Sequence, residues 1–197
     1  QAPQNMIVTG LFESGKSTLL QAVILNTVLA QTIGICFARD FVCTAFSCIN
    51  LYANIKDDLA NDRSLFKTEL YRAVQLLDYI KNLPPGAFNL TGTDCSFTGT
   101  EAGAGRAAAC AVARYLGTHY SNTLSIHTTN FFAMGLLAEQ FPTVFSAYYL
   151  PTTVTDDRIH HAYKLKPGIE KPHNYIAIFK EEGFPEEMVA TMEKVLK

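Results

Sequence analysis

Hydrophobic and polar positions along the chain form short apolar runs that alternate with longer amphipathic segments. Residues 6–8 are an apolar run typical of a buried strand, and residues 65–82 carry apolar side chains at the three- and four-residue spacing of an amphipathic helix. Because strands alternate with helices, the pattern predicts an α/β fold with a mostly parallel sheet flanked by helices. Further strands are predicted at 88–93 and 124–128, and further helices at 17–30, 106–117, 131–140, 174–182 and from Pro185 to the end.

The pattern also predicts two polar loops and one buried helix. Residues 53–63 and 96–105 read as loops, the first charged and the second rich in glycine and threonine. The helix at 17–30 is apolar nearly all round, which predicts that it is buried in the core and that Gly34 ends it.

Two regions favour additional strands. Residues 144–150 and 159–165 are predicted to pair through a polar turn at 152–157, which gives the fold a small antiparallel part. Residues 35–52 contain β-rich pieces in which alternate positions are apolar, namely Phe41 with Cys43 and Phe46 with Cys48.

The length, composition and net charge of the chain limit the kinds of protein that it can be. With 197 residues, 48% of them hydrophobic, and no linker-like tract, the chain is predicted to form one domain over 1–197, and its first four residues resemble the trimmed edge of a domain from a larger protein. The net charge of −2 gives no general attraction for nucleic acid. Five cysteines without a C-x-x-C pair favour reduced thiols in the cytoplasm or nucleus. Polar residues interrupt the most apolar window, 19–38, so no membrane span is expected.

The strongest chemical signal is the loop at 10–17, which matches G-x-x-x-x-G-K-[ST] at every fixed position. Gly10 and Gly15 allow the backbone to close around phosphate oxygens at the start of a helix. Lys16 supplies a positive charge for the outer phosphates, and Ser17 supplies a hydroxyl for Mg²⁺. The loop therefore predicts a P-loop NTPase that binds ATP with magnesium; the alternative is a glycine-rich turn with an exposed lysine.

The chain resembles the C-terminal ATPase domain of the MutS family of DNA mismatch-recognition proteins, a branch of the ABC-type ATPases. Two stretches carry most of the resemblance, 6–18 around the P-loop and 57–66 (DDLANDRSLF) before the long helix. The remaining matches are Asp94, Gly99-Thr100, Thr129 with Phe131, and Gly183-Phe184-Pro185.

The resemblance implies roles for individual residues. Asp94 corresponds to the Walker B aspartate that holds magnesium, and it could otherwise be a turn residue at a strand end. Ser64 corresponds to the signature serine that reaches the γ-phosphate of the partner's ATP across a dimer; its alternative role is a helix N-cap. The phosphate-binding residues implied are Gly10, Ser14, Gly15, Lys16, Ser17 and Thr18, and the metal-binding residues are Ser17 and Asp94.

The chain departs from the family at positions that matter for hydrolysis. Cys95 stands where the family has the glutamate that activates water, and a neutral thiol is a poor proton acceptor. Asn130 stands at a family histidine, and Leu11, Phe12 and Ser14 replace proline, asparagine and glycine. Glu101, in the loop after Asp94, is a candidate to replace the missing base.

These features predict an ATP-binding domain that works as a homodimer or as a heterodimer with another MutS-like chain, hydrolyses ATP weakly, and meets DNA only through other parts of the full protein. The alternative is a degenerate module for dimerisation or scaffolding. His127 is predicted to be a hydrogen-bonded core residue, and it is only a remote candidate base for a nucleophilic Cys95. His160, His161 and His173 read as surface residues, because no other metal ligand accompanies them at a suitable spacing.

Overall fold

A six-stranded sheet forms the centre of the fold. The computed structural model describes residues 5–53, 55–56, 59–61, 63–155, 158–169 and 176–195. The strand order is β2-β3-β4-β1-β5-β8, with all neighbours parallel except β5 and β8. The α/β class and the mostly parallel sheet are therefore confirmed. The strands are β1 (Asn5–Thr9), β2 (Cys48–Tyr52), β3 (Asn89–Asp94), β4 (Thr123–Thr129), β5 (Phe145–Tyr149) and β8 (Lys166–Pro167).

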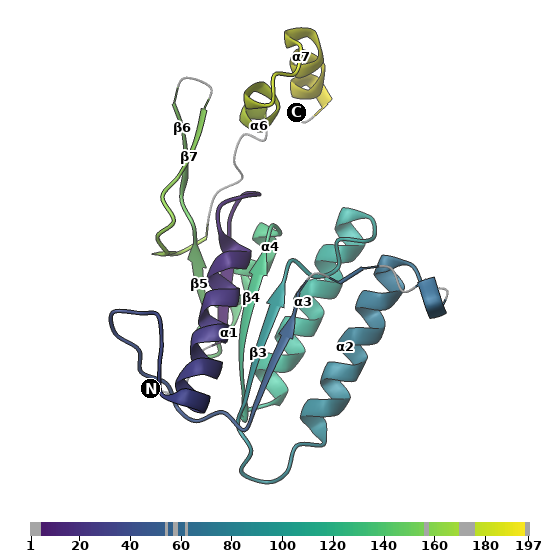
Figure 1. Ribbon diagram of the computed structural model, residues 1–197. Coiled ribbons are helices and arrows are strands. Elements are labelled where there is room, and N and C mark those ends of the chain that lie inside the picture. The colour runs from purple at the N-terminus through teal and green to yellow at the C-terminus, as the bar shows by residue number, and fades with distance from the viewer. Residues whose placement is uncertain are drawn as a thin grey trace.

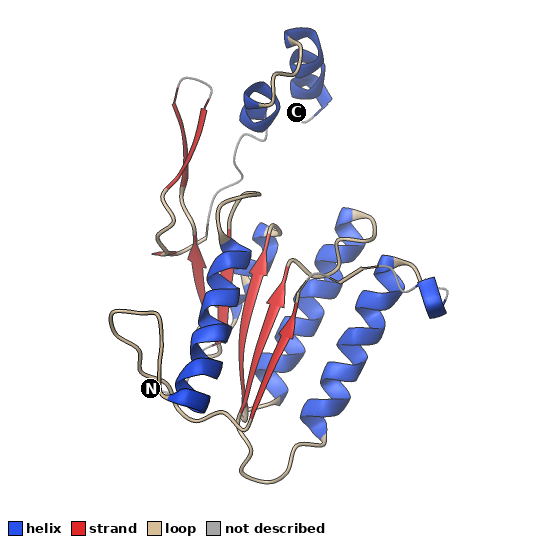
Figure 2. Ribbon diagram, in the orientation of Figure 1, coloured by secondary structure: helices blue, strands red, loops and turns tan. Residues whose placement is uncertain are grey.

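Helices cover both faces of the sheet (Figure 2). On one face α1 (Lys16–Ile33) packs against β2, β3 and β4. The other face carries α3 (Ala102–His119), α4 (Phe132–Gly135) and α5 (Leu137–Gln140), with α2 (Leu65–Lys81) packed beside α3. A short 3₁₀ turn, η1 (Leu59–Asn61), precedes α2.

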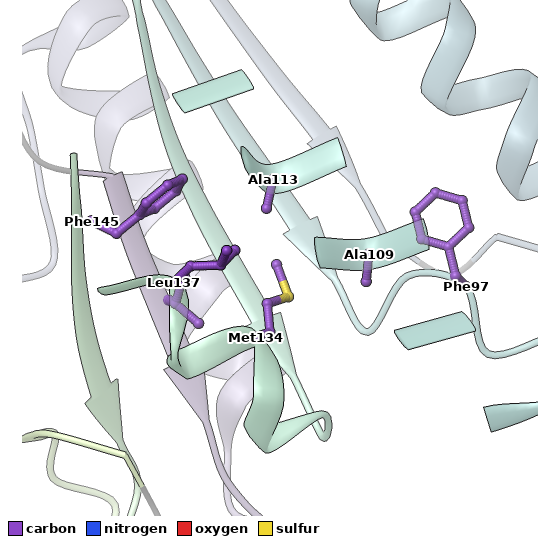
Figure 3. Packing of buried hydrophobic residues seen from close by; sticks show 7 residues of the cluster. Phe97, Ala109, Ala113, Met134, Leu137 and Phe145 are labelled. Carbon is purple, nitrogen blue, oxygen red and sulfur yellow. The ribbon is translucent and has the colours of Figure 1, made fainter. Parts of the chain in front are cut away.

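Each face has its own apolar cluster. Beneath α1, Leu20 and Ile24 pack on Leu90 and Ile126. Gly92 in β3 lets α1 approach closely, because a Cβ there would lie 2.9 Å from Leu20 Cδ1. The cluster on the opposite face joins β1, α3, α4, α5 and β5 (Figure 3); it consists of Ile7, Phe97, Ala109, Ala113, Met134, Leu137 and Phe145.

A β-hairpin and two helices extend beyond the carboxyl edge of the sheet (Figure 1). The hairpin pairs β6 (Thr152–Thr155) with β7 (Arg158–His161), and the helices are α6 (Ile176–Glu181) and α7 (Glu186–Val195). The small antiparallel part is thus confirmed, but the predicted pairing of 144–150 with 159–165 is wrong. β5 instead joins the main sheet beside β1, because its apolar start at Phe145 packs into the core.

The prediction that α1 is buried all round is also wrong. Leu20, Ile24 and Thr27 form its buried face, whereas Leu25 and Ile33 are 56% and 62% exposed. Gly34 ends the helix in a left-handed conformation, as predicted.

Residues 35–47 contain no strand, so of the predicted β-rich pieces only β2 forms. The backbone of this loop is hydrogen-bonded to side chains of α1 instead of to a neighbouring strand. Asn26 Oδ1 accepts a hydrogen bond from Phe37 N, and Gln31 both accepts from Phe46 N and donates to Phe46 O.

Other boundaries differ from the pattern for identifiable reasons. α3 begins four residues earlier than predicted, because Glu101 caps it through the N–H groups of Gly103 and Ala104. The helix predicted at 131–140 is divided into α4 and α5 around Leu136. Asn174, Asp57 and Asp58 lie outside the described residues.

Within the described ranges, none of the helices combines the length and the apolar character that a membrane span requires.

The sheet interior contains a hydrogen-bonded polar chain centred on His127. The Ser125 hydroxyl donates to Asn5 Oδ1 at 2.8 Å and therefore accepts from His127 Nε2, also at 2.8 Å. His127 Nδ1 then accepts from the Thr93 hydroxyl at 2.7 Å. The predicted core role of His127 is confirmed, and burial lowers its pKa to about 4.

This buried imidazole predicts a specific loss of stability in acid. Below pH 6.5 the unfolded chain protonates His127 while the folded chain does so only near pH 4, so the free energy of unfolding falls by roughly 3 kcal/mol across that window. His127→Gln, which keeps a donor and an acceptor, should show a decline smaller by that amount in urea unfolding from pH 7 to 4. Equal declines in both proteins would mean that His127 is not the group responsible.

Candidate functional site

The carboxyl ends of three adjacent strands meet at one place. The sheet register aligns Thr9 of β1 with Thr129 of β4, and Asp94 of β3 with Thr128. The loop at 10–15, the turn after Asp94 and Asn130 therefore leave the sheet at the same edge. This is where ligands bind in open parallel sheets.

The glycine-rich loop has the backbone geometry of an anion-binding turn. Gly15 is the N-cap residue of α1 and has φ +94°, a conformation that a side chain would strain. Glu13 adopts φ +61°, which is uncommon outside glycine. Ser14 is 1% exposed, and its Oγ has no hydrogen-bond partner among the described residues. A buried hydroxyl of this kind is a donor available to a ligand.

Lys16 turns back over the loop that precedes it. The side chain is 5% exposed, and Nζ donates to the carbonyl oxygen of Gly10 at 2.8 Å and to that of Leu11. An exposed lysine, the alternative that the sequence left open, is therefore wrong. The carbonyl contacts hold a full positive charge inside the loop, which requires such compensation when it is buried.

Asp94 connects this loop to the middle of the sheet. Its Oδ1 accepts a hydrogen bond from the Ser17 hydroxyl at 3.0 Å and another from the Thr128 hydroxyl at 2.5 Å. Carboxylate and hydroxyl oxygens are the ligand types that Mg²⁺ prefers. The structure thus brings together the two residues that the sequence paired as a metal site.

Cys95 follows Asp94 in a left-handed conformation, with φ +42°, and its N–H donates to Thr128 O at 2.9 Å. The pKa of its thiol is raised to about 11, chiefly by burial; the positive charge of Lys16 opposes this shift and the neighbouring Asp94 adds to it. The thiol therefore stays protonated at neutral pH and cannot accept a proton from water. His127 does not activate it, because both ring nitrogens are hydrogen-bonded to Thr93 and Ser125.

The side-chain oxygen of Asn130 is buried, whereas the carboxylate of Glu101 is exposed at the N-terminus of α3. The Oδ1 atom of Asn130 is buried and has no hydrogen-bond partner in the described ranges. The Glu101 carboxylate is fully exposed, and the N–H groups of Gly103 and Ala104 that it caps lower its pKa. Its described hydrogen bonds direct it to α3 rather than to Lys16 or Asp94.

Ser64 lies away from the loop of its own chain. It is the N-cap residue of α2, but its hydroxyl makes no capping hydrogen bond and the residue is exposed. Figure 1 shows the start of α2 on the far side of β3 and α3 from α1. The hydroxyl is therefore presented at the surface.

Two further residues, Tyr163 and Glu69, contact loops at this edge of the sheet, and no sequence pattern identified them. The Tyr163 ring lies against the loop, since a Cβ on Gly15 would be 3.1 Å from Tyr163 Cδ1. Glu69 of α2 is 4% exposed and accepts hydrogen bonds from backbone N–H groups at 97–99. Both contacts join segments far apart in sequence, so local patterns could not identify them.

Histidines contribute no comparable cluster. His160 and His161 lie on β7, and His161 Nδ1 is 3.3 Å from Thr152 Oγ1; His173 is outside the described residues. In the part of the chain that the structure describes, no three His, Cys, Asp or Glu side chains are grouped to hold a metal ion.

Comparison with known proteins gives a consistent similarity along the chain. Residues 6–197 match the family MutS domain V. The chain is 26% identical to the DNA mismatch repair protein MutS of Synechococcus sp. (strain JA-2-3B'a(2-13)) over 98% of its length and 21% of that protein. It is 25% identical to the protein of the same name from Natronomonas pharaonis, over 96% of this chain and 21% of the relative. For Chloroflexus aurantiacus (strain ATCC 29366 / DSM 635 / J-10-fl) the identity is 27%, over 94% of this chain and 19% of the relative. The chain spans about a fifth of the length of these relatives.

Proposed function

This chain belongs to the MutS domain V family, and from that premise we propose that it binds Mg-ATP at the loop of residues 10–17 and acts as a dimer within a DNA mismatch repair protein. The proposal rests on the hydrogen bond between Ser17 and Asp94, because it brings a hydroxyl of the first turn of α1 to a carboxylate at the end of β3.

The residues of the loop suit a chain of phosphates. Gly15 permits the tight turn, and the first amides of α1 point along the positive end of the helix dipole. Ser14 Oγ is a further donor without a partner among the described residues. In the structure Lys16 occupies the loop, and the γ-phosphate would replace the carbonyls of Gly10 and Leu11 as its partner.

Ser17 and Asp94 suit a magnesium ion bound with the nucleotide. Their oxygen atoms are 3.0 Å apart, and the Ser17 hydroxyl would turn from the carboxylate to the ion. When bound, magnesium neutralises charge on the phosphate oxygens. Thr128 would keep its hydrogen bond to Asp94 and hold the carboxylate in position.

The dimer follows from the position of Ser64. Its exposed hydroxyl, separated from the P-loop of the same chain, is available to the nucleotide of a second MutS-like chain. Contact with DNA would then belong to the remaining parts of the full protein, because this chain has no net positive charge.

Slow hydrolysis follows from Cys95. The raised pKa of its thiol removes the proton acceptor expected beside Asp94, and a positioned base contributes about 10²–10⁴-fold in rate. The same observation favours a second candidate function, a nucleotide-holding or scaffolding module without turnover.

Lys16→Ala should weaken Mg-ATP binding by about 100-fold or more, because charge-assisted hydrogen bonds to phosphate are lost. Lys81→Ala, at the exposed end of α2, is the matched control and should bind as the wild type does. Calorimetric titration measures both. Equal affinity in the wild type and Lys16→Ala would contradict a P-loop site.

Mg-ATP should promote a head-to-tail dimer that Ser64→Arg weakens, since a bulky cation would occupy the contact with the partner's loop. Ser121→Arg, placed before β4 at the opposite edge of the sheet, should leave dimerisation unchanged. Light scattering with and without nucleotide gives the mass. A chain that remains monomeric at high concentration with saturating Mg-ATP would refute the dimer.

Cys95→Glu should raise single-turnover hydrolysis by about tenfold or more, because a carboxylate restores a proton acceptor beside Asp94. Cys95→Ala should match the slow wild type, which shows that the thiol itself contributes nothing. Wild-type turnover of about 10 s⁻¹, unchanged in Cys95→Ala, would place the base elsewhere and defeat the slow-hydrolysis proposal.

A further inference from the structure

Glu69 is a buried charge to which the nucleotide site assigns no role. Among the described residues that are buried, the acidic or basic side chains are Lys16, Glu69 and His127, and His127 is neutral in the sheet interior. Lys16 belongs to the P-loop. Glu69 lies five residues after Ser64 on α2, on the side of the helix that faces the interior. A carboxylate is stable in such a place only when strong donors surround it.

The donors are three consecutive backbone amides. Oε1 accepts from Phe97 N at 2.6 Å and from Thr98 N at 3.1 Å, and Oε2 accepts from Gly99 N at 3.3 Å. Successive amides that converge in this way form a concave anion site, and here the protein's own carboxylate fills it.

The turn that Glu69 holds is strained and leads directly from Asp94. Cys95 and Phe97 have φ values of +42° and +64°, and neither is a glycine. Such conformations persist where surrounding contacts impose them. The Glu69 carboxylate holds the turn through its hydrogen bonds to the N–H groups at 97–99. The hydrogen bond from Cys95 N to Thr128 O holds the start of the turn against β4.

The same turn packs against the first residues of α2. A Cβ on Gly99 would lie 2.7 Å from Leu65 Cγ and 2.8 Å from Phe66 N, so no side chain fits between the turn and the helix. Glu69 therefore joins the segment after Asp94 to the first turns of α2, next to the N-cap residue Ser64.

We propose that Glu69 is a positioning residue that couples the partner-facing start of α2 to the metal-binding end of β3. The proposal rests on the proposed Mg-ATP site. Glu69 sets the direction of the Asp94 carboxylate through the 97–99 turn, so it influences magnesium binding without touching nucleotide or metal.

The test compares nucleotide affinity with Mg²⁺ and with a chelator, using a fluorescent ATP analogue. Glu69→Gln replaces one acceptor by an NH₂ group that faces N–H donors, so the gain in affinity from Mg²⁺ should fall by about tenfold. Glu101→Gln is the matched control, because it also removes a carboxylate that accepts backbone N–H groups beside this turn, but at the surface of α3. Its gain from Mg²⁺ should equal that of the wild type.

Urea unfolding of each variant separates positioning from stability alone. A Glu69→Gln protein that is less stable but keeps the wild-type gain from Mg²⁺ would overturn the proposal. Gly99→Ala leaves Glu69 intact and forces the turn off α2; it should also reduce the gain from Mg²⁺, and it decides the question if Glu69→Gln does not fold. A wild type that binds no nucleotide in either condition would instead refute the Mg-ATP site and this proposal with it.

Discussion

The hydrogen bond from Ser17 to Asp94 is the contact on which the candidate site depends. It joins the first turn of α1 to the end of β3 across β1 and β4, so it exists only when the parallel sheet is in register. A slip of one residue would turn Asp94 to the opposite face of the sheet. The order and register of the strands therefore determine which side chains meet at the candidate site.

The interior of the sheet explains how that register is held. The chain from Asn5 through Ser125 and His127 to Thr93 crosses β1, β4 and β3; its hydrogen bonds from Asn5 to Ser125 and from Thr93 to His127 join neighbouring strands in one alignment. A buried network of this kind is favourable only when every member is satisfied. Apolar packing on both faces then excludes water from the network.

Local signals made part of this structure predictable. The glycine-rich turn at 10–15 and the helix at 65–82 were readable because neighbouring residues determine them; the structure has a turn before α1 and the helix α2 at these places. The position of β5 was not readable, because it depends on β1, which is distant in sequence, and the loop at 35–47 depends on side chains of α1. Ser17 was identified from the loop pattern and Asp94 through the resemblance, whereas the burial of Glu69 and the raised pKa of Cys95 depend on contacts that only the folded chain defines.

The position of a bound metal ion relative to Ser17 would show whether Ser17 and Asp94 bind Mg-ATP. Mn²⁺ can replace Mg²⁺ at oxygen ligands, and in a crystal grown with Mn²⁺ and a non-hydrolysable ATP analogue its anomalous signal locates it. We predict a peak beside Ser17 Oγ on the side of Asp94, with the phosphates against residues 14–18 and Lys16 withdrawn from the carbonyls of Gly10 and Leu11. A nucleotide bound elsewhere, with Lys16 still in contact with those carbonyls at saturation, would contradict it.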